Sequence, residues 1–264
     1  MPARWNKNIE KSKYKELSDL YITQNKTISE IGKILKISES TVYDRLLRLR
    51  IKPNRSIKKG FNNTSSATIP YIRTRKLSEF FGIMLGDGCL TKTQVTVTLG
   101  NKETEYVDYV SKLITELFNI RPKVIKTKKG HYVVYFGSTK VVNWLLENGL
   151  VFNKVRQQVK PPSWIFEKRF RIEGFLKGIF DTDGSIYKLR FGVQIAFTNR
   201  SLPLLGAILR SLHILNYHPS KISMFRVYVT KRKYVLKFIK KIGFSNPKHR
   251  QRALKFVKYY KLDN

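Results

Sequence analysis

The chain has 264 residues and a formal net charge of +34 at pH 7, because it holds 52 Lys and Arg residues and only 18 Asp and Glu residues. With 42% hydrophobic and 12% aromatic residues it can bury a core, which excludes a disordered polycation. This excess of positive charge favours a polyanionic partner, and nucleic acid is the first candidate. No apolar run approaches the roughly 20 residues that span a bilayer, and Cys89, the single cysteine, excludes an intrachain disulfide. We therefore expect an intracellular protein without a membrane partner, either cytoplasmic, nucleoid-associated or in an organelle.

The first 52 residues have the pattern of a small all-α module. Apolar residues at helical spacing predict three short helices; Thr27 and Glu30 have the spacing of a capping box, and Ser38 is placed to cap the third helix. This order resembles a helix-turn-helix module, whose last helix enters the major groove of DNA. The residues expected to face DNA are Ser40, Thr41, Tyr43, Arg45 and Arg48. A helical hairpin that packs on the next domain is the alternative.

Residues 53–70 show no periodicity and are rich in Asn, Ser, Thr, Lys and Gly, which predicts a linker. After it the same order of elements is predicted twice, in residues 71–160 and in residues 161–264, where the second copy ends in a basic tail. Each copy is expected to hold a helix that ends in Asp-Gly, two strands, a helix, two more strands and a final helix. The expected fold is α+β, with two αββαββα halves that arose by duplication.

The first helix of each copy carries two glycines four residues apart, Gly82 with Gly86 and Gly174 with Gly178. A glycine inside a helix costs about 1 kcal/mol relative to alanine. Residues four apart share one face of a helix, so each pair offers a surface that a second backbone can approach closely. We expect the two helices to pack against each other through these glycines.

Both of these helices end in an aspartate, Asp87 and Asp183, where the helix dipole disfavours a carboxylate by about 0.3–1 kcal/mol. Helices that touch along their glycines would place the two carboxylates near each other. A divalent cation would relieve their repulsion. For a single Asp-Gly, an ordinary helix-ending turn is the alternative.

On these two motifs the chain resembles the LAGLIDADG family of homing endonucleases, in the monomeric form with two motifs. In register with the nine-letter motif, the chain reads FFGIMLGDG at residues 80–88 and LKGIFDTDG at residues 176–184. The first copy departs from the motif at Leu85, where an acidic residue is common. The resemblance covers roughly residues 77–250, with the helix-turn-helix as an added N-terminal module. It implies that the motif helices pack at a pseudo-twofold axis and that two four-stranded sheets form a saddle over double-stranded DNA.

The resemblance further implies a site-specific, intron-encoded endonuclease that hydrolyses both strands of one long, asymmetric DNA site. Its cofactor would be Mg²⁺ or Mn²⁺, and Ca²⁺ is expected to support binding without cleavage. Asp87 and Asp183 would be the catalytic metal ligands, with help from the backbone carbonyls of Gly86 and Thr182.

Two lysines, Lys154 and Lys248, follow the final helix of each copy at equivalent places, where the family often keeps a lysine near the scissile phosphate. They are the remaining catalytic candidates, and ordinary phosphate contacts or solvated charges are the alternatives. Asp181 precedes Asp183 by two residues and points elsewhere on the helix, so we expect it to be structural.

Strands in which apolar and polar residues alternate present one face to the helices and the other to solvent. The side chains in the row on the solvent face can contact the edges of DNA bases. The candidates for base contacts are Gln94, Thr96, Thr98, Lys188, Arg190 and Gln194. The candidates for phosphate contacts are Lys126, Lys128, Lys221 and Arg226. A slip of one residue in register would turn each row to the opposite face.

Two other functions fit the same scaffold. One is a DNA-binding transcriptional regulator, since a helix-turn-helix also suits transcriptional control. The other is an intron maturase, for which RNA would be the partner. The presence of both terminal aspartates argues against a protein that only binds.

Overall fold

The computed structural model describes residues 7–24, 26–51, 67–154 and 156–259. The chain divides into two compact units, Met1–Phe61 and Asn62–Asn264. Most of the predicted linker, residues 53–66, lies outside the described residues. Within the described ranges, no helix is both long and apolar enough to cross a membrane.

The N-terminal unit consists of short helices around a small apolar core. Its elements are α1 (Lys7–Ser18), the π-helical turn η1 (Asp19–Thr23), α2 (Ile28–Leu35) and α3 (Glu39–Arg48). The buried side chains are those of Leu17, Leu20, Ile31, Val42, Leu46 and Ile51. The helical character of this region is as predicted, and its assignment as a helix-turn-helix stays a prediction.

The predicted caps of α2 and α3 are confirmed. The Thr27 hydroxyl accepts the N–H of Glu30 at 3.2 Å, and the Glu30 carboxylate accepts the N–H of Thr27 at 2.7 Å. The Ser38 hydroxyl accepts the N–H of Thr41 at 3.2 Å and also lies 2.9 Å from the hydroxyl of Ser40. Such caps each stabilise a helix by about 1 kcal/mol. Ser40 and Thr41, both predicted to face DNA, therefore form part of the local hydrogen bonding at the start of α3.

The second unit begins with a helix and a four-stranded sheet. In chain order its elements are α4 (Arg75–Gly86), β1 (Gly88–Leu90), β2 (Gln94–Leu99), α5 (Thr104–Phe118), β3 (Lys123–Lys126), β4 (Tyr132–Gly137) and α6 (Thr139–Glu147). The strands are antiparallel in the order β1-β2-β4-β3. This matches the predicted order of helices and strands for the first half.

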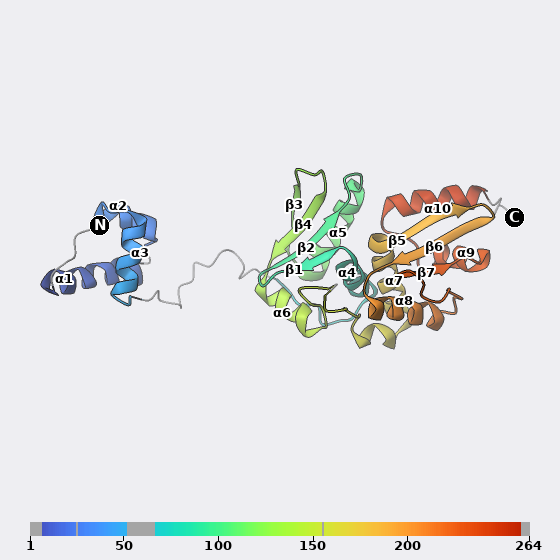
Figure 1. Cartoon of the computed structure of the whole chain (residues 1–264), viewed down its shortest axis with the longest axis horizontal. Helices are drawn as coiled ribbons and strands as arrows, with labels where there is room; N and C mark the ends of the chain where they lie inside the picture. The colour runs from blue at the N-terminus through green and yellow to red at the C-terminus, as the bar shows by residue number, and fades with distance from the viewer. Residues whose placement is uncertain (1–6, 25, 52–66, 155, 260–264) are drawn as a thin grey trace. The chain divides into compact units, whose positions relative to one another are not determined.

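The rest of the unit is built on a second sheet. Its elements are η3 (Ser163–Glu167), α7 (Arg169–Asp183), β5 (Gly184–Leu189), β6 (Gly192–Thr198), α8 (Leu202–Ile214), β7 (Arg226–Val229), α9 (Arg232–Lys241) and α10 (Pro247–Tyr259). Figure 1 shows α4 and α7 between the first sheet, in green, and the second sheet, in orange. The mixed α+β architecture with two sheets is as predicted.

The expectation of four strands in the second sheet is wrong for the described residues, which form three, in the order β5-β6-β7. The predicted fourth strand would pair with β7 through residues 221–223, where Ser223 and Arg226 form only an isolated bridge. Just before it, the Ser220 hydroxyl accepts the N–H of Tyr228 at 3.0 Å, in place of a backbone carbonyl. Pro219 has no N–H to donate to a ladder. A side chain and a proline thus interrupt the strand.

Glycines hold the two motif helices in backbone contact, as predicted. A Cβ added at Gly82 would lie 2.7 Å from the amide nitrogen of Ile179, and one added at Gly178 would lie 2.9 Å from the carbonyl carbon of Glu79. Real Cβ atoms do not approach backbone this closely, so α4 and α7 touch because the side chains are absent. This contact brings the ends of both helices, with Asp87 and Asp183, into one place.

Candidate active site

The two aspartates lie at the adjoining ends of α4 and α7. Asp87 caps the C-terminus of α4, and Asp183 is the last residue of α7. A Cβ added at Gly86 would overlap the Thr182 side chain and lie 3.5 Å from the carboxylate carbon of Asp183. The structure therefore brings together Asp87, Asp183, Gly86 and Thr182, the four residues predicted to surround a metal.

Burial raises the pKa values of both carboxylates. Burial, followed by the charge of Asp183, raises the pKa of Asp87 to about 7. Burial raises the pKa of Asp183 to about 6, although Asn199 and Lys154 oppose the shift. In the parts of the chain that the structure describes, no group of three or more His, Cys, Asp or Glu side chains is arranged to hold a metal ion. An oxygen-only set of two partly buried carboxylates plus a backbone carbonyl fits a hard divalent cation that also takes oxygens from its substrate.

Lys154 binds the end of α4. Its ammonium donates to the carbonyls of Met84 at 2.9 Å and Leu85 at 3.3 Å, and also to that of Gly86. Burial lowers its pKa, while the charges of Asp183 and Asp87 oppose that shift. The ammonium therefore supplies a positive charge to the helix end and to the carboxylate pair.

Lys248 has a different environment, although the sequence predicts an equivalent place for it. Its ammonium lies 3.3 Å from the carboxylate of Glu103 and is half-exposed. The carbonyl of Asp181, near the end of α7, is instead bonded by the side-chain amide of Asn246 at 3.2 Å. The charge of Lys248 still lowers the pKa of Asp87, so the lysine is close to the site. The end of α4 is thus bonded by an ammonium and that of α7 by a neutral amide.

Asp181 has the structural contacts expected of it. It is buried, and its carboxylate accepts the N–H of Ser245 at 2.8 Å. The hydroxyl of Ser245 in turn donates to Glu79 on α4 at 2.7 Å, as does the hydroxyl of Tyr109 on α5. These bonds connect α7, α4 and α5 behind the two catalytic candidates.

These pKa shifts predict how stability depends on pH in the presence of a chelator. Asp181, with a pKa raised to about 8 by burial, and Asp87, with a pKa of about 7, are largely protonated in the folded chain at pH 6.5 but ionised in the unfolded chain. Stability is therefore lost as the pH rises through these values. Between pH 6.5 and 8.5 we expect a loss of about 2–3 kcal/mol, or about 5–10 °C in Tm.

The measurement is thermal unfolding followed by circular dichroism at the two pH values. Burial lowers the pKa of His249 to about 4, so this residue is neutral in the folded chain throughout the range and contributes little above pH 7. Asp87→Asn should reduce the loss, because it removes one of the two ionisations. A Tm that stays constant or rises with pH would contradict the burial of these carboxylates.

The first sheet has one open face with polar side chains. Gln94, Thr96 and Thr98 alternate along β2 with the buried residues Val95, Val97 and Leu99, as predicted. Thr96 is opposite Tyr135 on β4, which itself is opposite Lys123 on β3. These side chains share the face away from the helices.

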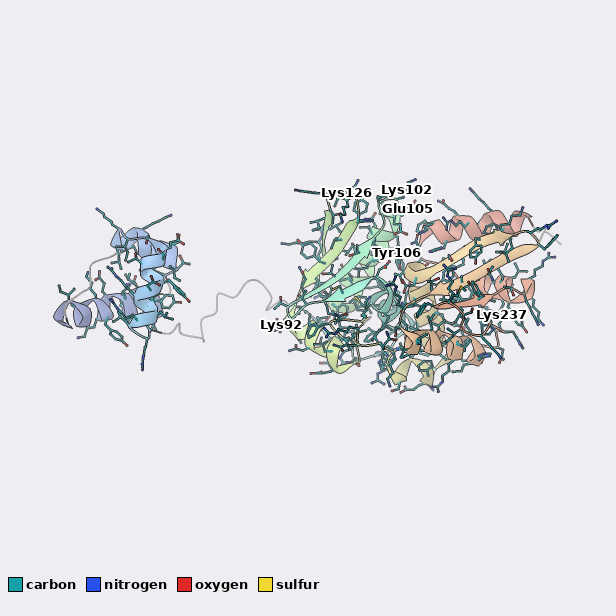
Figure 2. The ribbon with its side chains drawn as sticks, in the orientation of Figure 1. Lys92, Lys102, Glu105, Tyr106, Lys126 and Lys237 are labelled. Atoms are coloured by element: carbon teal, nitrogen blue, oxygen red, sulfur yellow. The ribbon has the colours of Figure 1, made fainter. Side chains whose placement is uncertain are left out.

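The two other lysines named for the first half lie elsewhere. Lys126 is opposite Tyr132, and its ammonium lies 5.3 Å from the centre of that ring. It therefore shares the face of the buried Val134, with a place at the outer end of β3 (Figure 2). Lys128 is exposed in the turn between β3 and β4.

In the second sheet the predicted base-reading row is split between two faces. Gln194 is opposite Tyr187, whose hydroxyl donates to the Gln194 side chain at 2.6 Å. Lys188 is opposite the buried Val193, on the other face. The expectation that Lys188 and Gln194 form one row is wrong, because Lys188 pairs with Val193, and Gln194 is the next residue along β6 and points to the opposite face. Arg190 lies in the turn, with its guanidinium 5.0 Å from the Phe191 ring centre.

The phosphate-contact candidates of this half are exposed. Arg226 begins β7 and is opposite Thr198. It shares the open face with Tyr228, two residues further along β7. Lys221 is exposed in the segment before the β7 turn.

Three residues near the site were not singled out from the sequence. Asn199, directly after β6, donates from its side-chain amide to Asp183 at 2.6 Å. Glu103, directly before α5, accepts bonds from Asn246 at 2.9 Å and from the N–H of Gly100 at 2.6 Å. Tyr187 pairs with Gln194 on the open face. Of the three, only Asn199 had a signal in the sequence, as the polar residue directly after the predicted strand that ends at Phe197 and Thr198.

Comparison with known families identifies both halves. Residues 171–243 match the family model described as LAGLIDADG-like domain. Residues 77–150 match the one described as WhiA LAGLIDADG-like domain. No curated protein matches the chain. The chain therefore carries LAGLIDADG-like domains in both halves, and α10 lies beyond the matched regions.

Solved structures of two kinds are similar to the chain. The N-terminal LAGLIDADG domain of DUF199/WhiA is 18% identical, with a TM-score of 0.47 over 67% of this chain and 87% of that one. Full-length DUF199/WhiA from Thermatoga maritima is 17% identical, with a TM-score of 0.48 over 74% of this chain and 63% of that one. The structure of I-DmoI in complex with DNA and Mn is 18% identical, with a TM-score of 0.45 over 65% of this chain and 98% of that one.

Proposed function

We propose that this chain, with a LAGLIDADG-like domain in each half, is a metal-dependent endonuclease that cuts both strands of one long, asymmetric DNA site. The observation that carries the proposal is the pair Asp87 and Asp183. Both are partly buried at the touching ends of α4 and α7, and their pKa values are raised. A protein that only binds DNA gains nothing from two such carboxylates at a surface that meets phosphates.

The chain's own residues would prepare this site for phosphodiester hydrolysis. Mg²⁺ or Mn²⁺ bound there would polarise the phosphate and lower the pKa of a water molecule. Asp87, Asp183 and the carbonyls of Gly86 and Thr182 would hold the ion, and Asn199 orients Asp183 through its amide. Lys154 places a positive charge where negative charge grows during the reaction.

Sequencing of cut ends tests this function directly. The purified chain is incubated with a randomised or genomic DNA library and Mg²⁺, and the ends of the fragments are sequenced. We expect staggered double-strand ends at one long site. Retention of specific duplexes on the protein without any cut ends, in Mg²⁺ or in Mn²⁺, would overturn the proposal.

A DNA-binding regulator is the second candidate, and the position of Lys154 favours it. The ammonium already bonds three carbonyls at the end of α4, so the carboxylate pair has a cation supplied by the chain itself. Binding to duplex DNA without cleavage would identify this function. Selective retention of structured RNA would instead identify an intron maturase.

The N-terminal unit is expected to add affinity through DNA phosphates. Deletion of residues 1–66 keeps Ala67, which is buried, and Thr68, whose N–H donates to the carbonyl of Phe118 at 2.9 Å. The truncated chain should therefore fold. We expect about tenfold weaker binding to DNA and a shallower dependence of log K on log salt concentration, because fewer phosphates are contacted. Fluorescence anisotropy in a salt series measures both, and an unchanged slope would mean that this unit does not touch DNA.

A further inference from the structure

The side chain of Lys154 places a cation of the chain itself at the end of α4. Its ammonium donates to the carbonyl of Met84 at 2.9 Å, to that of Leu85 at 3.3 Å and to that of Gly86. The last carbonyls of a helix have no partner within the helix and form the negative end of its dipole, so they attract cations. The carbonyl of Gly86 is also one of the groups that would hold a divalent ion. Two cations would therefore use the same oxygen.

The charge of Lys154 also reaches both carboxylates of the site. Burial raises the pKa values of Asp87 and Asp183, and the charge of Lys154 opposes that shift at each of them. When both carboxylates are ionised, Lys154 balances one of their two negative charges. A divalent ion that enters the site is therefore attracted by the carboxylates and repelled by the ammonium, and in a partly buried site this repulsion is stronger than in water.

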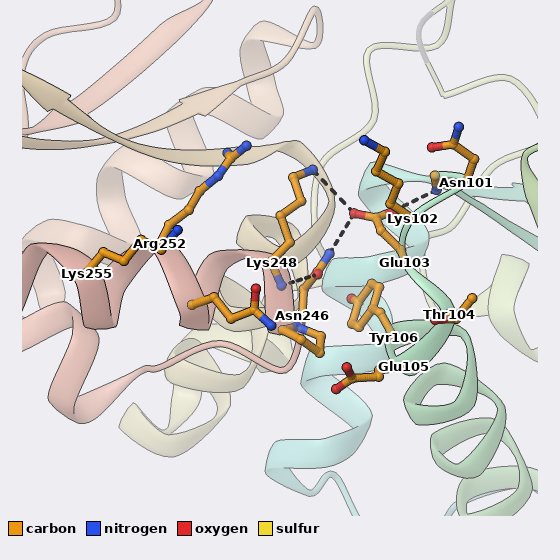
Figure 3. Close-up of a pocket in the computed structure, with 13 residues that line it drawn as sticks. Asn101, Lys102, Glu103, Thr104, Glu105, Tyr106, Asn246, Lys248, Arg252 and Lys255 are labelled. Carbon is orange, nitrogen blue, oxygen red and sulfur yellow. Dashed lines mark hydrogen bonds and ion pairs between the residues drawn. The ribbon is translucent and has the colours of Figure 1, made fainter.

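The second half does not repeat this arrangement. Lys248 lines a cavity of about 510 Å³ under α10, between the start of α5 and the start of α10. Figure 3 shows the bonds that Lys248, at 3.3 Å, and Asn246, at 2.9 Å, make to the carboxylate of Glu103. The carbonyl of Asp181 near the end of α7 accepts a bond from the neutral amide of Asn246 at 3.2 Å. The ends of α4 and α7 thus present different charges to an incoming ion.

We propose that Lys154 competes with a divalent cation for the end of α4 and thereby sets the affinity of the site for that ion. An ion lies about 2.0–2.6 Å from an oxygen ligand, and an ammonium lies about 2.9 Å from an oxygen that it bonds. Two cations on the Gly86 carbonyl would therefore be within about 5 Å of each other. The ion binds there by displacing the ammonium. The inference rests on the proposed function, which requires the divalent ion.

Lys237 provides a matched control, because its ammonium has the same kind of contacts at the end of a different helix. It donates to the carbonyl of Leu215 at 2.7 Å and to that of Asn216 at 3.2 Å, directly after α8. The variants Lys154→Gln and Lys237→Gln each remove a charge and keep an N–H donor for the helix end. Loss of a helix cap should affect both alike, whereas loss of a competing cation should affect only Lys154→Gln.

The experiment is a calorimetric titration of Ca²⁺ into the full chain without DNA, at constant ionic strength. We expect Lys154→Gln to bind Ca²⁺ about tenfold more tightly than wild type, because the repulsion is removed. Lys237→Gln should bind as wild type does. Lys154→Met, which removes the charge without adding a new polar group, should show the same gain as Lys154→Gln. The double variant Lys154→Gln/Asp183→Asn should lose the gain, because it lacks one of the two carboxylates.

Equal Ca²⁺ affinity in wild type and in both Lys154 variants would overturn the inference, and so would an equal gain in Lys237→Gln. This holds even if the wild type cuts DNA in Mg²⁺, in which case the proposed function stands without the inference. If only the Lys154 variants bind Ca²⁺, the ammonium replaces the ion in the wild type. The inference is then supported, and the proposed metal-dependent cleavage fails.

Discussion

Replacement of Asp87 or Asp183 by asparagine is expected to abolish double-strand cleavage while specific DNA binding in Ca²⁺ is retained. Asparagine keeps the size and one oxygen of the side chain but removes the charge that holds a divalent ion. The loss of several kcal/mol of transition-state stabilisation corresponds to a rate decrease of about 10³-fold. A supercoiled plasmid that carries the site, analysed for nicked and linear products, distinguishes cleavage of one strand from cleavage of both.

The matched control is Asp108→Asn, which changes an exposed aspartate on α5 in the same way. It should cut at the wild-type rate. The two site variants should also fold, because both remove a carboxylate whose pKa is raised by burial. If Asp87→Asn and Asp183→Asn each linearise the plasmid as fast as the control, these aspartates are not the catalytic pair.

The substitution Gly178→Ala is expected to lower the stability of the folded chain strongly. The added methyl group would meet the backbone of Glu79 on α4, with the Glu79 carbonyl carbon at 2.9 Å. Backbone cannot rotate away as a side chain can, so α4 and α7 would have to separate. We expect a loss of about 3 kcal/mol in the free energy of unfolding, equal to about 6–12 °C in Tm.

Gly206→Ala is the matched control, because Gly206 is also inside a helix, α8, and a Cβ added there has nothing within 4 Å. Alanine favours the helix over glycine, so this variant should gain about 0.5–1 kcal/mol. If stability falls for Gly178→Ala and rises for Gly206→Ala, the contact between α4 and α7 is the cause of the loss. A Gly178→Ala protein as stable as wild type would show that α4 and α7 do not touch at this point.

Much of the site could be predicted because its signals are local. The spacing of two glycine pairs is enough to predict a close contact of two helix backbones, and the structure contains this contact. The pairs are Gly82 with Gly86 and Gly174 with Gly178. The caps at Thr27 and Ser38 follow from side-chain oxygens placed three residues before an N–H group. Alternation along β2 correctly placed Gln94, Thr96 and Thr98 on the open face.

Other features depend on partners that lie far away in the sequence. The face of Lys188 follows from its pairing with Val193, and periodicity within one strand does not determine that register. The strand expected at residues 221–223 is lost because the Ser220 side chain replaces a ladder bond to β7. The environments of Lys154 and Lys248 differ because the ammonium of Lys248 bonds the carboxylate of Glu103, which lies 145 positions earlier in the sequence.

The sequence by itself thus determined the helices, their caps, the glycine contact and the pair of terminal aspartates. Each of these is encoded in residues within a few positions of one another, where backbone geometry sets which side chains share a face. Only the tertiary structure decided the strand faces, the different partners of the two lysines, the bond from Asn199 to Asp183, and the cavity under α10. These depend on which distant segments meet, as Ser245 and Glu79 do across 166 positions.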